Sequence, residues 1–291
     1  MPPAANFTPS LVSPQILILI KSMDIGGHAG GAEVFGINLA CALKAKGQQV
    51  DSIGLLAYGT QAEKNSIKTL QECGVRASFL WDVPLKAHTQ TQYIPPIGQT
   101  IKKLHNYIEN NHVKIVHSSS QACNPLAVGL KLRKGSPVVM RTAHISREWG
   151  ENISAAVLRT FFSGIIYPLL MDAEVAVSKD LQTLLNQRRA ARVLKKSCHY
   201  IPNGINPTKL MLGQDALVPV PEADRGDFRL VSIGALTPRK GHSILIEAMA
   251  ELLAVYPQAR LDIVGSGELQ GALENQVKQK GLSQAVRVLG V

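Results

Sequence analysis

The chain has 291 residues, of which 45% are hydrophobic and 18% are charged. This length corresponds to about two domains, and the composition excludes a protein that is mainly disordered, collagen-like or coiled-coil. The 31 Lys and Arg residues outnumber the 21 Asp and Glu residues and give a net charge of +10. That charge predicts an acidic partner: a phosphate group, a nucleic acid or an anionic membrane surface.

The first residues and the cysteines bear on where the protein resides. Residues 1–14 lack the basic start and apolar stretch of a signal peptide, so we expect a disordered tail and a cytoplasmic protein. The longest apolar run, Ile16 to Ile20, is much shorter than the roughly 20 residues of a membrane-spanning helix. No C-x-x-C pair is present, which predicts four free, buried thiols in a reducing compartment: Cys41, Cys73, Cys123 and Cys198.

Apolar, β-branched runs alternate with segments that are mostly long enough for a helix over residues 15–204. The runs predict strands at residues 15–20, 50–57, 113–117, 137–143 and 173–178. Residues 32–46 have a helical pattern, with Val34 and Ile37 near one stripe and Gly47 as a stop signal. This alternation predicts an α/β domain with a doubly wound parallel sheet.

Residues 205–227 have no clear periodicity and contain Gly213, Pro219, Pro221 and Gly226, which predicts a linker. The strand and helix patterns then resume, with strands expected at 228–234, 260–265 and 285–290 and helices at 243–255 and 268–281. Open parallel sheets usually have about five or six strands. We therefore expect residues 228–291 to form a partial second domain.

Two glycine-rich loops each join a predicted strand to a predicted helix. In the first, DIGGHAGGAEVF, Gly30 and Gly31 are either a phosphate cradle or a plain tight turn, and Glu33 is interpreted as a partner of the helix dipole. In the second, Gly265, Gly267 and Gly271 resemble a dinucleotide fingerprint. The following strand lacks the acidic residue that holds the ribose, so an NAD(P)-dependent oxidoreductase is the weaker alternative.

Arg239 and Lys240 stand in the loop GALTPRKGHS, directly before an apolar helix. Cations at a helix N-terminus are unfavourable for the helix dipole unless an anion lies there, so the pair predicts a phosphate ligand. A Walker A loop is excluded because Arg239 occupies the position that requires glycine. The alternative is a solvated basic turn.

His117 and His144 each end a predicted strand, at the sheet edge where ligands of open parallel sheets bind. For each, a catalytic and a structural role remain open. No histidine pair has the spacing of a helical metal site, so we expect no metal.

A basic segment lies beside the apolar stretch 153–171. It either docks on anionic lipid or forms a solvated helix face beside an interdomain core helix, and its lack of interleaved aromatic residues argues against nucleic acid. Its cations are Arg188, Arg189, Arg192, Lys195 and Lys196.

Six segments in this order resemble the retaining, nucleotide-sugar-dependent glycosyltransferases of the GT-B fold, the family 4 or group 1 type, which have two Rossmann-like domains. The resemblance covers nearly the whole chain from Gln15. The segments are GGAEVFGINLACALKAKGQQV, AVSKDLQTLL, IPNGINP, LVSIGALTPRKGHSILIEAMAEL, IVGSGELQGALENQVKQKG and LSQAVRVLG.

The resemblance implies sugar transfer from a UDP- or GDP-sugar to a glycan or lipid-linked acceptor, with retained configuration and without a metal or other cofactor. It also implies a role in cell-surface polysaccharide or glycolipid synthesis at the inner face of the membrane. It places His144 near the transferred sugar as the catalytic residue. It assigns the other candidates to the donor: Gly30, Gly31, Arg239 and Lys240 to its diphosphate, and Gly265, Gly267 and Glu268 to its nucleotide side.

The chain departs from the family pattern in two places. Ala235 stands where the family often has arginine, and the family's E-x7-E element would lie beyond Val291. We therefore expect a truncated second domain and a 291-residue chain that is inactive alone. The alternative is an inactive binding or interaction remnant of such an enzyme.

Overall fold

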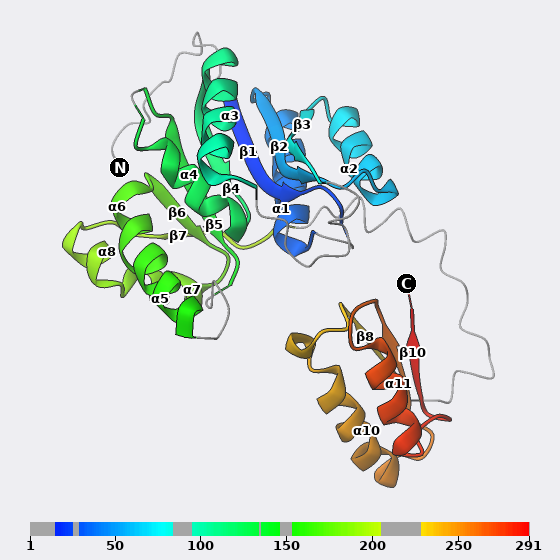
Figure 1. Ribbon diagram of the computed structural model, residues 1–291. Helices are drawn as coiled ribbons and strands as arrows, with labels where there is room; N and C mark the ends of the chain where they lie inside the picture. Colours follow the sequence, from blue (N-terminus) through cyan, green and yellow to red (C-terminus); the bar gives the residue numbers. More distant parts are fainter. Residues whose placement is uncertain are drawn as a thin grey trace, which may run out of the picture. The chain divides into compact units, whose positions relative to one another are not determined.

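The computed structural model describes residues 15–25, 29–83, 95–133, 135–145, 153–204 and 228–290. Contacts within the chain divide it into two compact units, Met1–Ile205 and Asn206–Val291. Each unit is built on its own parallel sheet, which confirms the predicted α/β class (Figure 1). The expected tail at 1–14 and linker at 205–227 lie outside the described residues.

A seven-stranded parallel sheet forms the centre of the first unit. Its strands are β1 (Gln15–Ser22), β2 (Val50–Ala57), β3 (Arg76–Asp82), β4 (Val113–Ser118), β5 (Val138–Ala143), β6 (Ala173–Ala176) and β7 (His199–Tyr200). The order across the sheet is β3-β2-β1-β4-β5-β6-β7. The five predicted strands are present. β3 and β7 were not predicted, because β3 is only partly buried and β7 has just two residues.

Helices cover both faces of this sheet. Alternate residues of β1 enter two separate cores: Leu17 and Leu19 pack with residues of α3 and α4, and Ile18 and Ile20 pack with residues of α1 and α2. Burial on both faces explains the continuous apolar run in β1. The helical segments are α1 (Gly31–Ala45), α2 (Gln61–Glu72), α3 (Ile97–Asn110), α4 (Asn124–Leu130), α5 (Ile153–Phe161), the π-helical η3 (Phe162–Ile166), α6 (Tyr167–Leu170), α7 (Lys179–Asn186) and α8 (Arg189–Val193).

Residue 36 has to be small because α1 packs closely on the sheet. A Cβ placed on Gly36 would lie 2.5 Å from Cγ2 of Ile20 and 3.3 Å from Cβ of Ser119. Real Cβ atoms do not approach other carbons as closely as the first of these distances, so a larger residue would push α1 away from β1 and β4. The glycine therefore sets the position of the N-terminus of α1 at the carboxyl edge of the sheet.

A buried ionic cluster joins β5, β6 and the start of α8. The Nε of Arg141, which is fully buried, donates to Oε1 of Glu174 at 2.8 Å, and Arg188 donates to the same carboxylate. Burial alone would raise the pKa of Glu174, but the charges and hydrogen bonds of the two arginines outweigh it and hold that pKa below its usual value. The sequence placed Arg188 in a solvent-facing basic segment, and that was wrong: its side chain is directed inward.

The second unit contains a three-stranded parallel sheet in the order β10-β9-β8. Its core lies between the sheet and two helices. On the other face of β8, Val231 and Ile233 are 65% and 78% exposed. The elements are β8 (Arg229–Ile233), the 3-10 helix η6 (Pro238–Lys240), α10 (His242–Val255), β9 (Arg260–Val264), α11 (Gln270–Gln279) and β10 (Val286–Leu289). Nowhere in the described part of the chain is a helix long and apolar enough to cross a membrane.

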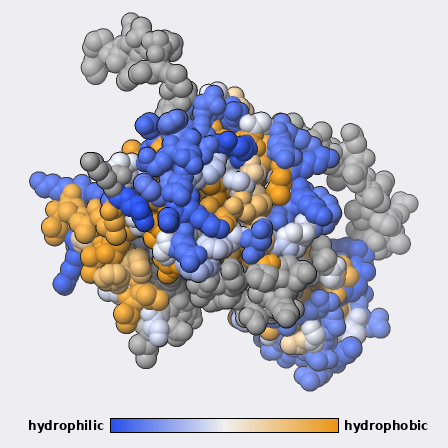
Figure 2. Space-filling model, turned by 45° about the horizontal axis from the view of Figure 1, so that its top comes forward, coloured by the Kyte–Doolittle hydropathy of each residue, from blue (hydrophilic) through white to orange (hydrophobic). Residues whose placement is uncertain are grey.

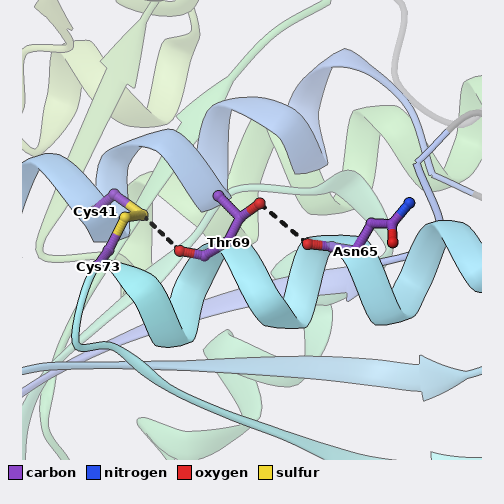
Figure 3. The surroundings of a disulfide bond; sticks show 4 residues. All are labelled: Cys41, Asn65, Thr69 and Cys73. Carbon is purple, nitrogen blue, oxygen red and sulfur yellow. Dashed lines mark hydrogen bonds between the residues drawn. A yellow bond between two sulfur atoms is a disulfide. The ribbon is translucent and has the colours of Figure 1, made fainter.

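The prediction of four free thiols was wrong for one pair. Cys41 in α1 and Cys73 at the end of α2 form a disulfide with a Cα–Cα distance of 5.3 Å (Figure 3). The two residues are 32 positions apart in the chain and become neighbours only because α1 and α2 pack side by side. Cys123 and Cys198 are free and buried, as expected. Disulfides persist mainly in oxidising compartments, so the bond argues against a fully reduced protein.

Removing this disulfide should destabilise the first unit. In the chain-entropy account, a crosslink that closes a loop of 32 residues contributes about 3 to 4 kcal/mol. We expect the double variant Cys41→Ser, Cys73→Ser to lose about that much free energy of unfolding in denaturant titrations without reductant. Tryptophan fluorescence reports on this unit alone, because Trp81 and Trp149 both precede residue 205.

The matched control is the reductant. It should lower the stability of the wild type to that of the double variant and leave the double variant unchanged. Four reactive thiols in the denatured, unreduced wild type would contradict the bond.

Candidate functional site

The carboxyl edge of the seven-stranded sheet brings together residues that are far apart in the sequence. All strands are parallel, so β1, β4 and β5 end at the same edge. α1 begins a short loop after β1, the Ser119 backbone follows β4, and His144 follows β5. Open parallel sheets bind their ligands at this edge. Gly26, Gly27 and His28 of the first glycine-rich loop lie outside the described residues.

Gly30 and Gly31 form the N-terminus of α1. Gly30 is the N-cap, and its backbone N–H donates to Oε2 of Glu33 at 2.9 Å. This capping contact confirms the interpretation of Glu33 as a partner of the helix end. Gly31 is exposed, and a Cβ placed on it would meet nothing within 4 Å. Among the described residues, none therefore fills the space beside Gly31, and a helix N-terminus of this kind favours an anion.

His144 lies beside the first turns of α1. Its ring meets the Phe35 ring edge-on, with 5.0 Å between the centroids. Burial lowers the pKa of His144, and a hydrogen bond with the Ser119 backbone offsets part of that effect. The imidazole is therefore neutral at neutral pH. Its Nε2 is buried and has no hydrogen-bond partner among the residues that the structure describes.

His117 is buried within β4. Its Nε2 is 2.8 Å from Oγ1 of Thr142 on the neighbouring strand. Burial, with a smaller contribution from the charge of His144, lowers the pKa of His117 to about 4. The sequence favoured His144 over His117 as the functional histidine. In the fold, Nε2 of His117 is paired with Thr142 within the sheet, and Nε2 of His144 is buried without a partner among the described residues.

In the second unit, Lys240 and His242 both lie over Gly234 at the carboxyl end of β8. A Cβ placed on Gly234 would be 3.7 Å from Cδ and Cε of Lys240 and 3.8 Å from Nε2 of His242. The Lys240 side chain is exposed, and Arg239 beside it is exposed as well. His242 is 3% exposed, and its Nε2 has no partner within the described part of the chain.

His242 was missed by the sequence reasoning. Its burial follows from the packing of α10 on β8, with Nδ1 3.4 Å from Oγ of Ser232, and no local pattern indicates that packing. The position directly after Lys240 and Gly241 was the only available signal.

Gly265 and Gly267 are required by contact between two loops. A Cβ on Gly265 would lie 2.0 Å from the Gly234 carbonyl oxygen, and one on Gly267 would lie 2.6 Å from that of Leu236. The φ of Gly267 is also positive, at 155°. Gly271 instead has open space around it, although the third glycine of a dinucleotide fingerprint serves close helix–strand packing. Glu268 is exposed just before α11.

Comparison with known proteins decides the family. The family described as Glycosyltransferase Family 4 matches residues 29–209, and the family described as Glycosyl transferases group 1 matches residues 214–291. The chain belongs to glycosyltransferase family 4. A curated relative, an uncharacterized glycosyltransferase of Methanocaldococcus jannaschii, is 31% identical over 102 residues. That match covers 34% of this chain and only 25% of the relative.

Solved structures show the fold of this family 4 chain to be GT-B-like. TarM of S. aureus, in a complex that contains UDP, has a TM-score of 0.63 at 10% identity and matches over 95% of this chain and 77% of its own. Sucrose-phosphate synthase of Thermosynechococcus elongatus has a TM-score of 0.64 at 18% identity, over 95% and 70%. Starch Synthase IV of Arabidopsis thaliana has a TM-score of 0.63 at 13% identity, over 96% and 74%.

Across the described ranges, no group of three or more His, Cys, Asp and Glu residues is arranged to hold a metal ion. The residues that the sequence predicted to bind the donor lie at two carboxyl edges, one in each unit. His144 and the helix terminus at Gly30 and Gly31 belong to the first edge, and Lys240 belongs to the second.

The lowered pKa of His117 makes the first unit sensitive to acid. Between pH 6.5 and about 4, the unfolded chain binds a proton at His117 that the folded chain does not. The contribution of neutral His117 to the free energy of unfolding is therefore complete above pH 6.5 and is lost as the pH falls toward 4. We expect His117→Gln to reduce this loss by about 3 kcal/mol in denaturant titrations followed by tryptophan fluorescence. The exposed variant His199→Gln should keep the wild-type profile, and an unchanged profile for His117→Gln would contradict a neutral, buried His117.

Proposed function

We propose that this family 4 chain supplies the donor-binding and catalytic groups for transfer of a sugar from a UDP- or GDP-sugar. The acceptor is a glycan or lipid-linked hydroxyl that attacks the anomeric carbon from the face that the diphosphate leaves, so the configuration is retained. As the chain matches only part of its curated relative, the activity of the whole protein is part of this proposal.

The position of Lys240 is the observation that carries the proposal. Its ammonium group is exposed at the carboxyl edge of the second sheet, and its methylenes lie over Gly234. An uncompensated cation beside the N-terminus of α10 is stabilised by a bound phosphate. The unpartnered Nε2 of His242 offers a further polar group beside the same glycine. Arg239 adds a second exposed cation.

The first unit contributes an open helix terminus and a neutral imidazole. In the proposal, the N-terminus of α1 at Gly30 and Gly31 faces the donor diphosphate. The Gly30 N–H already donates to Glu33, so the backbone contact to the diphosphate comes from Gly31. His144 lies beside this terminus through its contact with Phe35. Its Nε2 would form a hydrogen bond with the transferred sugar and hold it during transfer.

The negative charge on the leaving diphosphate grows in the transition state, so preorganised donors must meet it. Such contacts are each worth roughly 10² to 10³ in rate. We propose that Lys240, Arg239 and the N-terminus of α1 meet this charge without a metal cofactor. Gly265, Gly267 and Glu268 would lie on the nucleotide side, where the two glycines keep the loops close enough to present Glu268 to the donor.

We further propose that the product is a cell-surface polysaccharide or glycolipid, made in the cytoplasm at the inner face of the membrane, with no part for nucleic acid. The net positive charge of the chain supports a location beside an anionic membrane surface. The Cys41–Cys73 bond stands against a reducing compartment, so trapping of free thiols in intact cells is the direct check of location.

Lys240→Ala should weaken donor binding about tenfold or more, since the variant loses a charge-assisted contact to phosphate. Isothermal titration calorimetry with UDP, GDP and several of their sugars measures this without requiring turnover. The matched control is Lys278→Ala, which removes the same charge from an exposed position in the last turn of α11. Equal affinities for the two variants would rule out the role of Lys240.

His144→Ala should separate binding from transfer. We expect the rate of radiolabelled sugar transfer by a catalytically competent chain to fall about tenfold to a thousandfold, since one positioned polar contact is lost. Donor affinity and melting temperature should change little, because His144 lies at the sheet edge. A large fall in melting temperature with a normal rate in the folded fraction would assign His144 a structural role. A chain extended to include the E-x7-E element that binds donor and still transfers no sugar would indicate the inactive binding remnant.

A further inference from the structure

An apolar stripe covers the outer side of the helix formed by α5, η3 and α6. Four of its exposed side chains recur at steps of four residues: Val157 at 64%, Phe161 at 50%, Ile165 at 49% and Leu169 at 51%. Steps of four residues keep side chains on one side of a helix. Monomeric soluble proteins rarely leave contiguous apolar surface of this kind uncovered unless it has a partner.

α8 extends the same surface. It packs against η3 and α6. Its last residue, Val193, is 81% exposed, and Leu194, which follows it, is 41% exposed. Figure 2 shows hydrophobic surface gathered at the left of the view, on the side where Figure 1 places α5, α6 and α8. We call this set of residues on α5, η3, α6 and α8 the apolar face.

Cations border the apolar face. Arg189, Arg192, Lys195 and Lys196 are all exposed. The Nζ of Lys196 donates to the carbonyl oxygens of Leu169 at 3.3 Å and Met171 at 2.7 Å, which places this lysine at the end of the apolar stripe. No Asp or Glu occurs in the sequence from 153 to 171 or from 181 to 200, so these segments carry no acidic residue of their own.

The surface is also held in place before any partner binds. Nη1 of Arg188 donates to the Ser163 carbonyl in η3 at 2.7 Å, and the same side chain is bound to the buried Glu174. Arg188 therefore fastens the start of α8 to the helix that carries the stripe. A preformed surface loses less entropy on binding than one that must be ordered.

We propose that the apolar face docks the protein on an anionic lipid membrane. Apolar side chains that enter the acyl boundary beside cations that meet lipid headgroups are the combination that interfacial binding requires. A second copy of the chain fits less well, because symmetric pairing would bring its cations toward those of the first. Lipid binding requires no sugar chemistry, so this inference and the proposed sugar transfer fail separately.

Sedimentation with vesicles tests the proposal on the full chain. We expect binding to vesicles of equimolar phosphatidylcholine and phosphatidylglycerol, little binding to phosphatidylcholine alone, and weaker binding as salt rises. Phe161→Glu with Ile165→Glu should weaken binding at least about tenfold, as should Arg192→Glu with Lys195→Glu. The charge control is Lys64→Glu with Lys102→Glu, and the apolar control is Ile97→Glu, which is 62% exposed on α3.

Val193→Glu guards against a folding failure, because its side chain is 81% exposed and its replacement disturbs little packing. Loss of vesicle binding in this variant with unchanged UDP affinity supports the proposal. Absence of wild-type binding to anionic vesicles overturns it, as do patch variants that bind as well as their controls. Self-association in light scattering that Phe161→Glu abolishes, without vesicle binding, would assign the face to a second copy instead.

Discussion

The close packing of α1 on β1 is the constraint on which the first carboxyl edge depends. β1 is buried on both faces at the middle of the sheet, and residue 36 can contact Ile20 and Ser119 only because it is glycine. This approach holds the first turns of α1 against Ile20 of β1 and Ser119 after β4. The Phe35–His144 contact follows from it, and so does the proximity of an open helix terminus to a neutral imidazole.

In the second unit, glycines likewise allow a close approach at the carboxyl edge of the sheet, but between two loops instead of between a helix and a strand. Gly265 and Gly267 let the loop after β9 touch the backbone of the loop after β8 at Gly234 and Leu236. Hydrogen bonds from Gly234 N to the Val264 carbonyl and from Leu236 N to the Ser266 carbonyl lock the two loops together. The loop that carries Lys240 is thus fixed by backbone contacts, and its long side chain remains in solvent.

Local patterns predicted much of this fold, because strands buried on both faces and glycine-rich loops leave signals within a few residues. The strands from β1 to β10 followed from them, apart from β3 and β7. Features that depend on distant pairing left no such signal. Cys41 and Cys73 meet only through the packing of α1 on α2, and Arg188 is directed inward only because Glu174 lies buried beneath it. The sequence favoured His144, but only the fold showed that Nε2 of His117 is paired with Thr142 and that Nε2 of His144 has no partner among the described residues.

We propose that each of the two carboxyl edges contacts the phosphates of a nucleotide donor. Amide hydrogen exchange of the full chain with and without UDP tests it most directly, because exchange reports on backbone protection at each edge separately. We predict slower exchange on UDP addition at Gly30 to Phe35 and at Thr237 to His242. We predict no change at the far end of the first sheet around His112. Unchanged exchange at both edges under saturating UDP, or protection confined to other segments, would contradict the proposal.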